Sequence, residues 1–297
     1  MQFYVHSGRL GKSGVPWAVV WGLFVGLLLC RYYDRALDWV PLVLANPLLT
    51  IAYGFAVGWA TAFGAKLGHL RNPPVAKLLG GLTGLAAVYI AWAYTPMMRM
   101  GWYEGPVWDF ASLWDYVKLQ YEQGSWSLWP SGPPVAGVLL VAVWLVEAAL
   151  IVVVSARTAR NRLVDLPYCE ETLQWMKREK SVARLSLADE GADAKVERLK
   201  QGDLSVLSEL PQATGTEPPY LQLELASIKE CSFCKFLTVT LVDAVANEKG
   251  RVRRQKRRLL DKLQVSDDDL PLIRGAGSEH SEDSSRDAAG NDAVEPA

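Results

Sequence analysis

Long apolar runs that are nearly free of charged side chains constrain this chain more than any other feature. The runs lie at 15–33, 39–65, 77–96 and 135–155. A helix needs about 20 apolar residues to cross the roughly 30 Å of hydrocarbon in a bilayer, and most of the runs reach that length. The sequence therefore predicts an all-α membrane domain, a bundle of four transmembrane helices within residues 15–155.

Charge is distributed unevenly along the 297 residues, although the formal net charge is only −1. A short tail, 1–14, precedes the membrane domain, and charged residues dominate from Arg157 onward. A small α+β cytosolic domain is expected at 156–274. Residues 275–297 are rich in Ser, Gly, Asp and Glu and are expected to form a disordered acidic tail.

Basic residues near the ends of the spans predict the orientation, because Lys and Arg are retained on the cytosolic side of a membrane. They are more frequent before the first span, between the second and third spans, and after the fourth span. Both termini are therefore expected in the cytosol, with 31–38 and 96–134 outside. No small-x-small cleavage site follows Cys30, so the first span is expected to stay uncleaved.

The outer loop 96–134 is rich in tryptophan and carries apolar residues at helical spacing. These residues are Phe110, Leu113, Trp114, Val117 and Tyr121. Aromatic rings are favoured at the membrane–water interface, which predicts an interfacial helix here. A platform for a ligand is the alternative.

Glycine pairs with G-x-x-x-G spacing occur in three of the expected spans. They are Gly22 with Gly26, Gly54 with Gly58, and Gly80 with Gly84. Because glycine lets helix backbones approach closely, the pairs predict a tightly packed bundle or a homo-oligomer. Pro47 is expected to kink the second span.

Glu147 lies near the middle of the fourth expected span. An ionised carboxylate at a helix centre costs at least ~2.5 kcal/mol, so this side chain is expected to face the bundle and to be protonated or paired. Either it hydrogen-bonds helices together as a neutral acid, or it forms the proton or cation site of a transporter or channel. The expected hydroxyl partners are Thr50, Tyr53, Thr83 and Tyr89.

The polar domain contains short helical segments at 195–200 and 203–210, followed by two alternating strands at 220–225 and 236–242. The turn between the strands holds Cys231 and Cys234. A C-x-x-C turn between two strands is the way in which a zinc knuckle is built.

The other half of a zinc ribbon is incomplete, because Thr172 stands where a second cysteine would follow Cys169. A degenerate, metal-free ribbon is therefore expected, and no cofactor apart from zinc is considered. Zinc held by three cysteines is the alternative, with a fourth ligand from Glu170, Glu171, Asp165 or water. A redox pair is less favoured, since the C-x-x-C motif does not begin a helix.

A dense basic run precedes three leucines near the end of the polar domain. The run comprises Lys249, Arg251, Arg253, Arg254, Lys256, Arg257 and Arg258. Anionic lipid attracts such residues by ~1 kcal/mol each, so contact with the inner leaflet is expected. A solvated helix face is the plain alternative, and nucleic acid is a less favoured partner.

Residues 46–76, with the segments PYCEETLQW at 167–175 and ECSFC at 230–234, resemble a set of bacterial inner-membrane proteins with a C-x-x-C-bearing, zinc-ribbon-like cytosolic tail. The resemblance implies a multi-pass protein of a bacterial inner membrane. It brings no activity and no catalytic residues.

No catalytic motif such as H-E-x-x-H or G-x-S-x-G occurs, and His6 stands where a P-loop before Gly11, Lys12 and Ser13 would need glycine. The expected function is that of a non-enzymatic anchor, sensor or interaction protein with a cytosolic protein partner. The alternative is a transporter or channel for a small solute, protons or cations, using Glu147.

Overall fold

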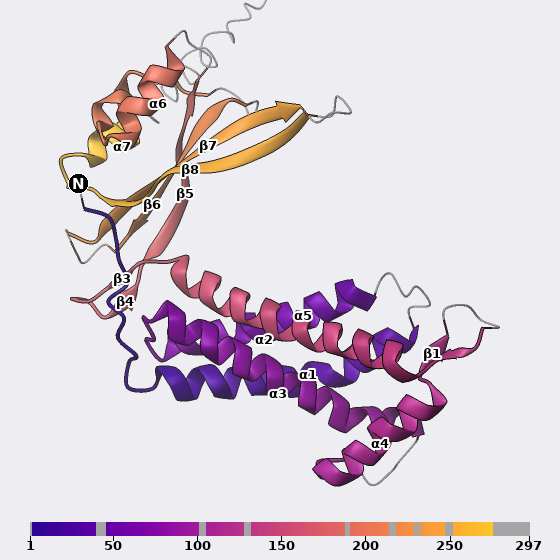
Figure 1. Ribbon diagram of the computed structural model, residues 1–297. Helices are drawn as coiled ribbons and strands as arrows, with labels where there is room; N and C mark the ends of the chain where they lie inside the picture. Colours follow the sequence, from indigo (N-terminus) through magenta and orange to yellow (C-terminus); the bar gives the residue numbers. More distant parts are fainter. Residues whose placement is uncertain are drawn as a thin grey trace, which may run out of the picture. The chain divides into compact units, whose positions relative to one another are not determined.

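The computed structural model describes residues 2–39, 46–100, 105–127, 132–187, 191–213, 218–228, 231, 233–246 and 252–275. The chain divides into two compact units (Figure 1). The helical unit is His6–Asp165, and the C-terminal unit combines Met1–Val5 with Leu166–Ala297.

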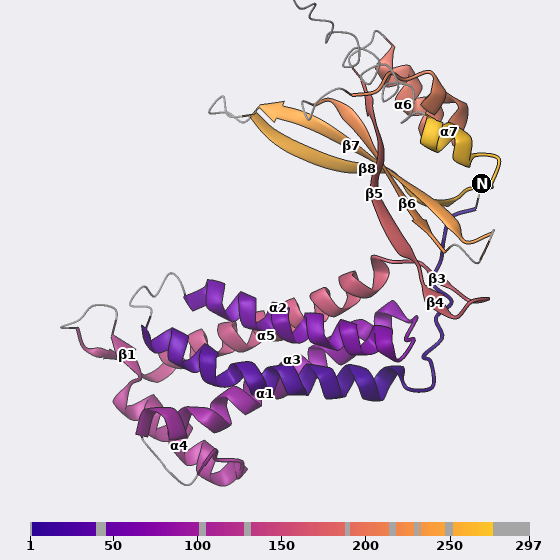
Figure 2. The same cartoon turned by 180° about the vertical axis from the view of Figure 1, so that it is seen from behind.

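Four long apolar helices build the helical unit: α1 (Gly14–Trp39), α2 (Asn46–Leu67), α3 (Pro73–Met100) and α5 (Gly137–Val164). By length and composition, all four are able to cross a membrane. Figures 1 and 2 show them side by side, and α1 and α5 each pack against both α2 and α3. The prediction of a helical bundle with four candidate spans and a β domain is confirmed at this level.

The boundary between the first two helices differs from the prediction. Helix α1 continues to Trp39 through the segment 31–38 that was expected to be an outer loop, so Trp39 does not open the second span. Helix α2 begins at Asn46, and Pro47 occupies its first turn. The predicted kink at Pro47 is therefore wrong. Backbone N–H groups in the first turn have no partner within the helix, so the N–H that proline lacks is not missed there.

The six G-x-x-x-G glycines lie at helix–helix contacts. Gly22 faces Thr61 and Thr83, Gly26 faces Ala87, Gly54 faces Ile151, Gly58 faces Ser155, Gly80 faces Ser155 and Ala159, and Gly84 faces Val152 and Ser155. Hydroxyl groups bridge the same interfaces. Ser155 Oγ donates to the Gly80 carbonyl over 2.7 Å, and the Thr61 and Thr83 hydroxyls lie 2.8 Å apart.

A shorter helix, α4 (Phe110–Gln123), lies between α3 and α5 in the sequence, within the Trp-rich segment where a helix was expected. The Asp109 carboxylate caps it by accepting from Ser112 N over 2.8 Å. Leu113 and Tyr116 are buried, and Trp114 is exposed. Strand β1 (Trp126–Ser127) then pairs with β2 (Pro134–Val135). The location of α4 at a membrane surface stays a prediction.

An antiparallel sheet of four strands, in the order β5-β6-β7-β8, forms the C-terminal unit. The strands are β5 (Lys177–Ser186), β6 (Tyr220–Ser227), β7 (Lys235–Ala246) and β8 (Val252–Gln264). Helices α6 (Ala192–Lys200) and α7 (Leu270–Gly275) and the 3-10 turn η1 (Leu204–Ser208) share a leucine-rich core with the sheet. The hairpin of β3 (Tyr168–Cys169) and β4 (Gln174–Trp175) precedes β5.

Sequence patterns located β6, β7 and α6, and the structure excludes a predicted helix in one segment and an alternative helix in another. The expected helix 203–210 is the shorter 3-10 turn η1, capped by Asp203. The basic run lies on strand β8, paired with β7, and not on a helix. Lys249, Arg251 and the expected tail beyond Gly275 lie outside the described residues.

Within the tail 1–14 that was expected before the bundle, residues 2–4 form an arm on β8. Phe3 bridges to Leu263, Tyr4 N donates to the Lys262 carbonyl over 3.0 Å, and Gln264 N donates to the Gln2 carbonyl over 2.8 Å. Residues 2–4 are called the N-terminal arm below.

Candidate functional site

Three cysteines from two turns of the C-terminal unit converge. Cys169 ends strand β3, whereas Cys231 and Cys234 lie in the turn between β6 and β7. Their Sγ atoms all lie within 4.8 Å of one another. Cys169 and Cys231 are buried, and Cys234 is partly buried. These three residues, the thiol cluster, could hold a metal ion.

Hydrogen bonds single out Cys169 as the acceptor of the thiol cluster. Cys234 Sγ donates to Cys169 Sγ over 2.6 Å, and the backbone N–H of Thr172 donates to the same sulfur over 3.5 Å. Burial raises the pKa of Cys169, but hydrogen bonding from Cys234, Thr172 and the Glu171 backbone outweighs it and leaves the pKa below its ordinary value. Burial raises the pKa of Cys231 and of Cys234. The thiolate form, which binds metals, is therefore favoured first at Cys169.

The thiol cluster fits a tetrahedral zinc ion. Zinc–sulfur bonds of about 2.3 Å place two ligand sulfurs about 3.8 Å apart. The separations here, from 2.6 Å upward and all within 4.8 Å, bracket that value. Met176, Ile228 and Phe236 surround the cluster with apolar surface, and the Tyr4 ring packs edge-on against Phe236 at 5.2 Å.

A carboxylate lies beside the thiol cluster. The Cys231 thiol donates to Glu171 Oε2 over 3.4 Å. Glu171 was one of the groups considered as a fourth ligand. Asp165, another of them, ends the helical unit and is not part of the C-terminal unit.

Glu147 of α5 lines a pocket of about 80 Å³ together with a second carboxylate, Asp34 of α1. Asp34 is only 5% exposed, so this acid lies inside the bundle. Thr95 Oγ1 donates to Asp34 Oδ1 over 3.4 Å. Further polar lining comes from Tyr33, Tyr116, Gln120 and Ser125, and indole rings come from Trp92 and Trp144. These residues form what is called the acidic pocket below.

The four hydroxyl residues expected as partners of Glu147, Thr50, Tyr53, Thr83 and Tyr89, are not among the described residues that line this pocket. Thr50 bonds with Tyr33, Tyr53 donates to the Gly26 carbonyl, Thr83 bonds with Thr61, and Tyr89 donates to the Trp108 carbonyl.

Asp34 was missed because the segment 31–38 was interpreted as a loop. The available signal was its helical spacing, since Asp34 follows Cys30 by four residues and therefore shares a helix face with that apolar position.

The described members of the basic run are exposed on the edge strand β8. They are Arg253, Arg254, Lys256, Arg257 and Arg258. Charged side chains on an edge strand prevent its pairing with another sheet, so these residues have a structural role besides any contact with anionic lipid.

Comparison of the chain with protein-family models, curated proteins and solved structures finds no match. Its function must therefore be inferred from the thiol cluster, the acidic pocket and the helices that could cross a membrane.

Proposed function

We propose that this chain is a multi-pass protein of a bacterial inner membrane whose bundle anchors a cytosolic, zinc-holding domain. In this proposal it acts as a non-enzymatic sensor or interaction protein. The gathering of Cys169, Cys231 and Cys234 carries the proposal, because three thiols within 4.8 Å supply three of the four ligands of a structural zinc site.

Two observations support cytosolic termini. Basic residues flank the span ends on the side of both termini, as cytosolic segments do. The N-terminal arm also belongs to the same compact unit as the residues from Leu166 onward. An even number of spans is needed to keep both parts on one side, and the four candidate spans satisfy this requirement.

The geometry favours zinc over the metal-free ribbon that the missing cysteine at position 172 had indicated. Loss of one thiolate leaves three sulfurs that still converge, and Glu171 lies next to them. Metal binding by such a set fixes the β3–β4 hairpin to the turn between β6 and β7. Zinc would therefore stabilise a surface that a partner could recognise.

Metal content of the full chain, purified from membranes in detergent, tests this proposal. The parent protein is expected to retain about one zinc ion per chain. Cys231→Ser and Cys234→Ser should lose it, whereas Cys30→Ser should retain it, because Cys30 lies in α1 and donates to the Leu27 carbonyl. A parent protein without zinc, or zinc that survives both C-x-x-C substitutions, would refute the proposed site.

The acidic pocket supports a second candidate, a proton or cation pathway through the bundle. Two carboxylates from different helices, Asp34 and Glu147, line one pocket. Ionisable groups inside a membrane bundle commonly mark such pathways. The presence of both acids in one pocket is the observation that favours this function over a purely structural role for Glu147.

Ion flux into liposomes containing the parent protein, Glu147→Gln or Glu147→Leu separates these roles. Transport predicts that the Gln variant is stable but inactive, because an amide keeps the shape of the acid and does not titrate. A structural role predicts a stable, unaltered Gln variant and an unstable Leu variant.

A further inference from the structure

Three thiolates leave one corner of a zinc tetrahedron to be filled. Structural zinc sites are almost always four-coordinate, with ligands from cysteine, histidine or carboxylate. The position that would supply a fourth cysteine holds Thr172. A group from the same turn can occupy the corner only if it reaches the space between the sulfurs.

Glu171, in the turn between β3 and β4, places its carboxylate beside Cys231, one of the three sulfurs. To fill the corner, this carboxylate must rotate toward Cys169 and Cys234 when the metal binds. Leu173 closes this turn with a left-handed φ of 54°, which folds the chain back tightly after Glu171. Zinc bonds of about 2.1 Å to oxygen and 2.3 Å to sulfur place the two ligand atoms about 3.6 Å apart. Glu171 Oε2 lies 3.4 Å from Cys231 Sγ, close to that separation.

We propose that Glu171 is the fourth ligand of a zinc site whose other ligands are Cys169, Cys231 and Cys234. The inference rests on the zinc site of the proposed function and identifies its complete donor set. A carboxylate carries the same charge as the thiolate that it replaces. Because oxygen is a harder donor than sulfur, this corner should be the one at which the metal exchanges.

Thr172 has a different role in the same turn. Its backbone N–H donates to Cys169 Sγ over 3.5 Å. Since the spacing from Cys169 to Thr172 matches C-x-x-C, a cysteine at position 172 should direct its thiol to the corner assigned to Glu171. Thr172→Cys is therefore a gain-of-ligand test.

Titration of the detergent-purified full chain with Co²⁺, followed by displacement with Zn²⁺, tests the assignment. Glu171→Gln should weaken Co²⁺ binding at least about tenfold and change the visible d–d bands, with unchanged charge-transfer absorbance from the thiolates. Glu170→Gln, one residue away, is the matched control and should behave like the parent. Thr172→Cys should bind more tightly, raise the charge-transfer absorbance by about a third, and restore tight binding to Glu171→Gln.

The outcomes separate the two proposals. A parent protein that binds neither ion defeats the zinc site itself. A parent protein that binds Co²⁺, with Glu171→Gln identical to it in affinity and spectrum, overturns only the role of Glu171. If Glu170→Gln weakens Co²⁺ binding and Glu171→Gln does not, the role of Glu171 is likewise overturned and the zinc site remains. Rescue of Glu171→Gln by Thr172→Cys excludes misfolding as the cause of its weak binding and supports the proposed ligand.

Discussion

Single glycines determine how closely the helices of the bundle approach. A Cβ atom added at Gly58 would lie 2.8 Å from Ser155 Cα and 2.9 Å from the Ser155 carbonyl carbon. Both are backbone atoms, which cannot rotate away as the end of a side chain can. Lipid supplies no hydrophobic drive for helices to associate, so close packing at such glycines holds α2 against α5.

Gly58→Ala should therefore destabilise the bundle by about 1–3 kcal/mol, the usual effect of overpacking. Gly81→Ala is the matched control, because its added Cβ would meet Ala156 Cβ at an ordinary 3.8 Å. Denaturant unfolding in detergent micelles measures the difference. Equal stabilities of the two variants would show that α2 and α5 do not pack as described.

Residue types indicated part of the candidate site before the structure did. A C-x-x-C turn and a lone Cys169 predicted a ribbon-like gathering of thiols, because metal-ligand spacing is a local property. Glu171 could not be chosen over Glu170, since which carboxylate lies beside Cys231 depends on the turn that Leu173 closes. Asp34 of α1 and Glu147 of α5 line one pocket because their helices pack in the same bundle, which no local pattern records.

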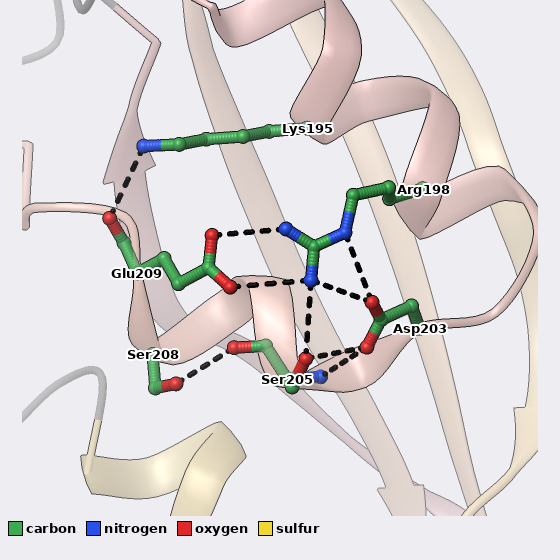
Figure 3. Close-up of polar contacts among 6 residues, drawn as sticks. All are labelled: Lys195, Arg198, Asp203, Ser205, Ser208 and Glu209. Atoms are coloured by element: carbon green, nitrogen blue, oxygen red, sulfur yellow. Dashed lines mark hydrogen bonds and ion pairs between the residues drawn. The ribbon is translucent and has the colours of Figure 1, made fainter.

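At the scale of elements, a polar network fixes α6 to η1 (Figure 3). The Arg198 guanidinium donates to Asp203 Oδ2 over 2.7 Å and forms two bonds with the Glu209 carboxylate. Asp203 Oδ1 accepts from Ser205 N and caps η1. Hydrogen bonds from Ser205, and then from Arg198, hold the pKa of Asp203 below its ordinary value.

The network should lose stability in acid. The pKa of Asp203 is lower in the folded state than in the unfolded state. The Asp203 carboxylate therefore contributes fully to folding stability above the unfolded pKa of about 3.9, and this contribution is lost as the pH falls through the folded pKa. In the parent protein, the amides of residues 192–210 should lose protection from hydrogen exchange between neutral pH and about pH 3. This loss should be smaller in Asp203→Asn. Asp193→Asn, on α6 but outside the network, should keep the parental pH dependence. An unchanged profile in Asp203→Asn would contradict the assignment.

Strands in which hydrophobic residues alternate were predictable, and charged strands were not. Strand β6 places Leu221, Leu223 and Leu225 on one face, which is the period-two signal of a half-buried strand. Strand β8 opens with a basic stretch and then buries Leu260 and Leu263, a spacing equally typical of a helix. Pairing with β7 decides its conformation, and sequence patterns contain no direct record of such long-range pairing.

For the whole molecule, orientation is the property most open to direct test. Alkaline phosphatase is active only outside the cytosol, so a fusion after Gly124 should be active and one after Gln264 inactive. The reason is the excess of basic residues at the span ends expected in the cytosol. Fusions of green fluorescent protein at the same sites should give the reverse result. Phosphatase activity at Gln264 would invert the proposed topology.

The N-terminal arm links the two ends of the described chain. The Tyr4 hydroxyl accepts from Tyr168 N over 3.0 Å, next to Cys169, and its ring packs on Phe236. Tyr4→Phe should cost about 1 kcal/mol of domain stability through one lost hydrogen bond, and Tyr4→Ala clearly more. Thermal unfolding and the rate of zinc release measure the effect. Val5→Ala serves as the control, since Val5 is 81% exposed.

Biosynthesis gives the arm a further significance. Residues 2–4 emerge from the ribosome before any span, whereas β8 emerges after all of the candidate spans. At a synthesis rate of 5–20 residues per second, β8 is made on the order of 10 to 50 seconds after the arm. The bundle can insert during that interval, while the segment of β8 around Leu263 stays without its contact to the arm. The arm can therefore dock only after β8 has been made, and a chain whose arm is held elsewhere would lack its contacts with Lys262, Leu263 and Gln264.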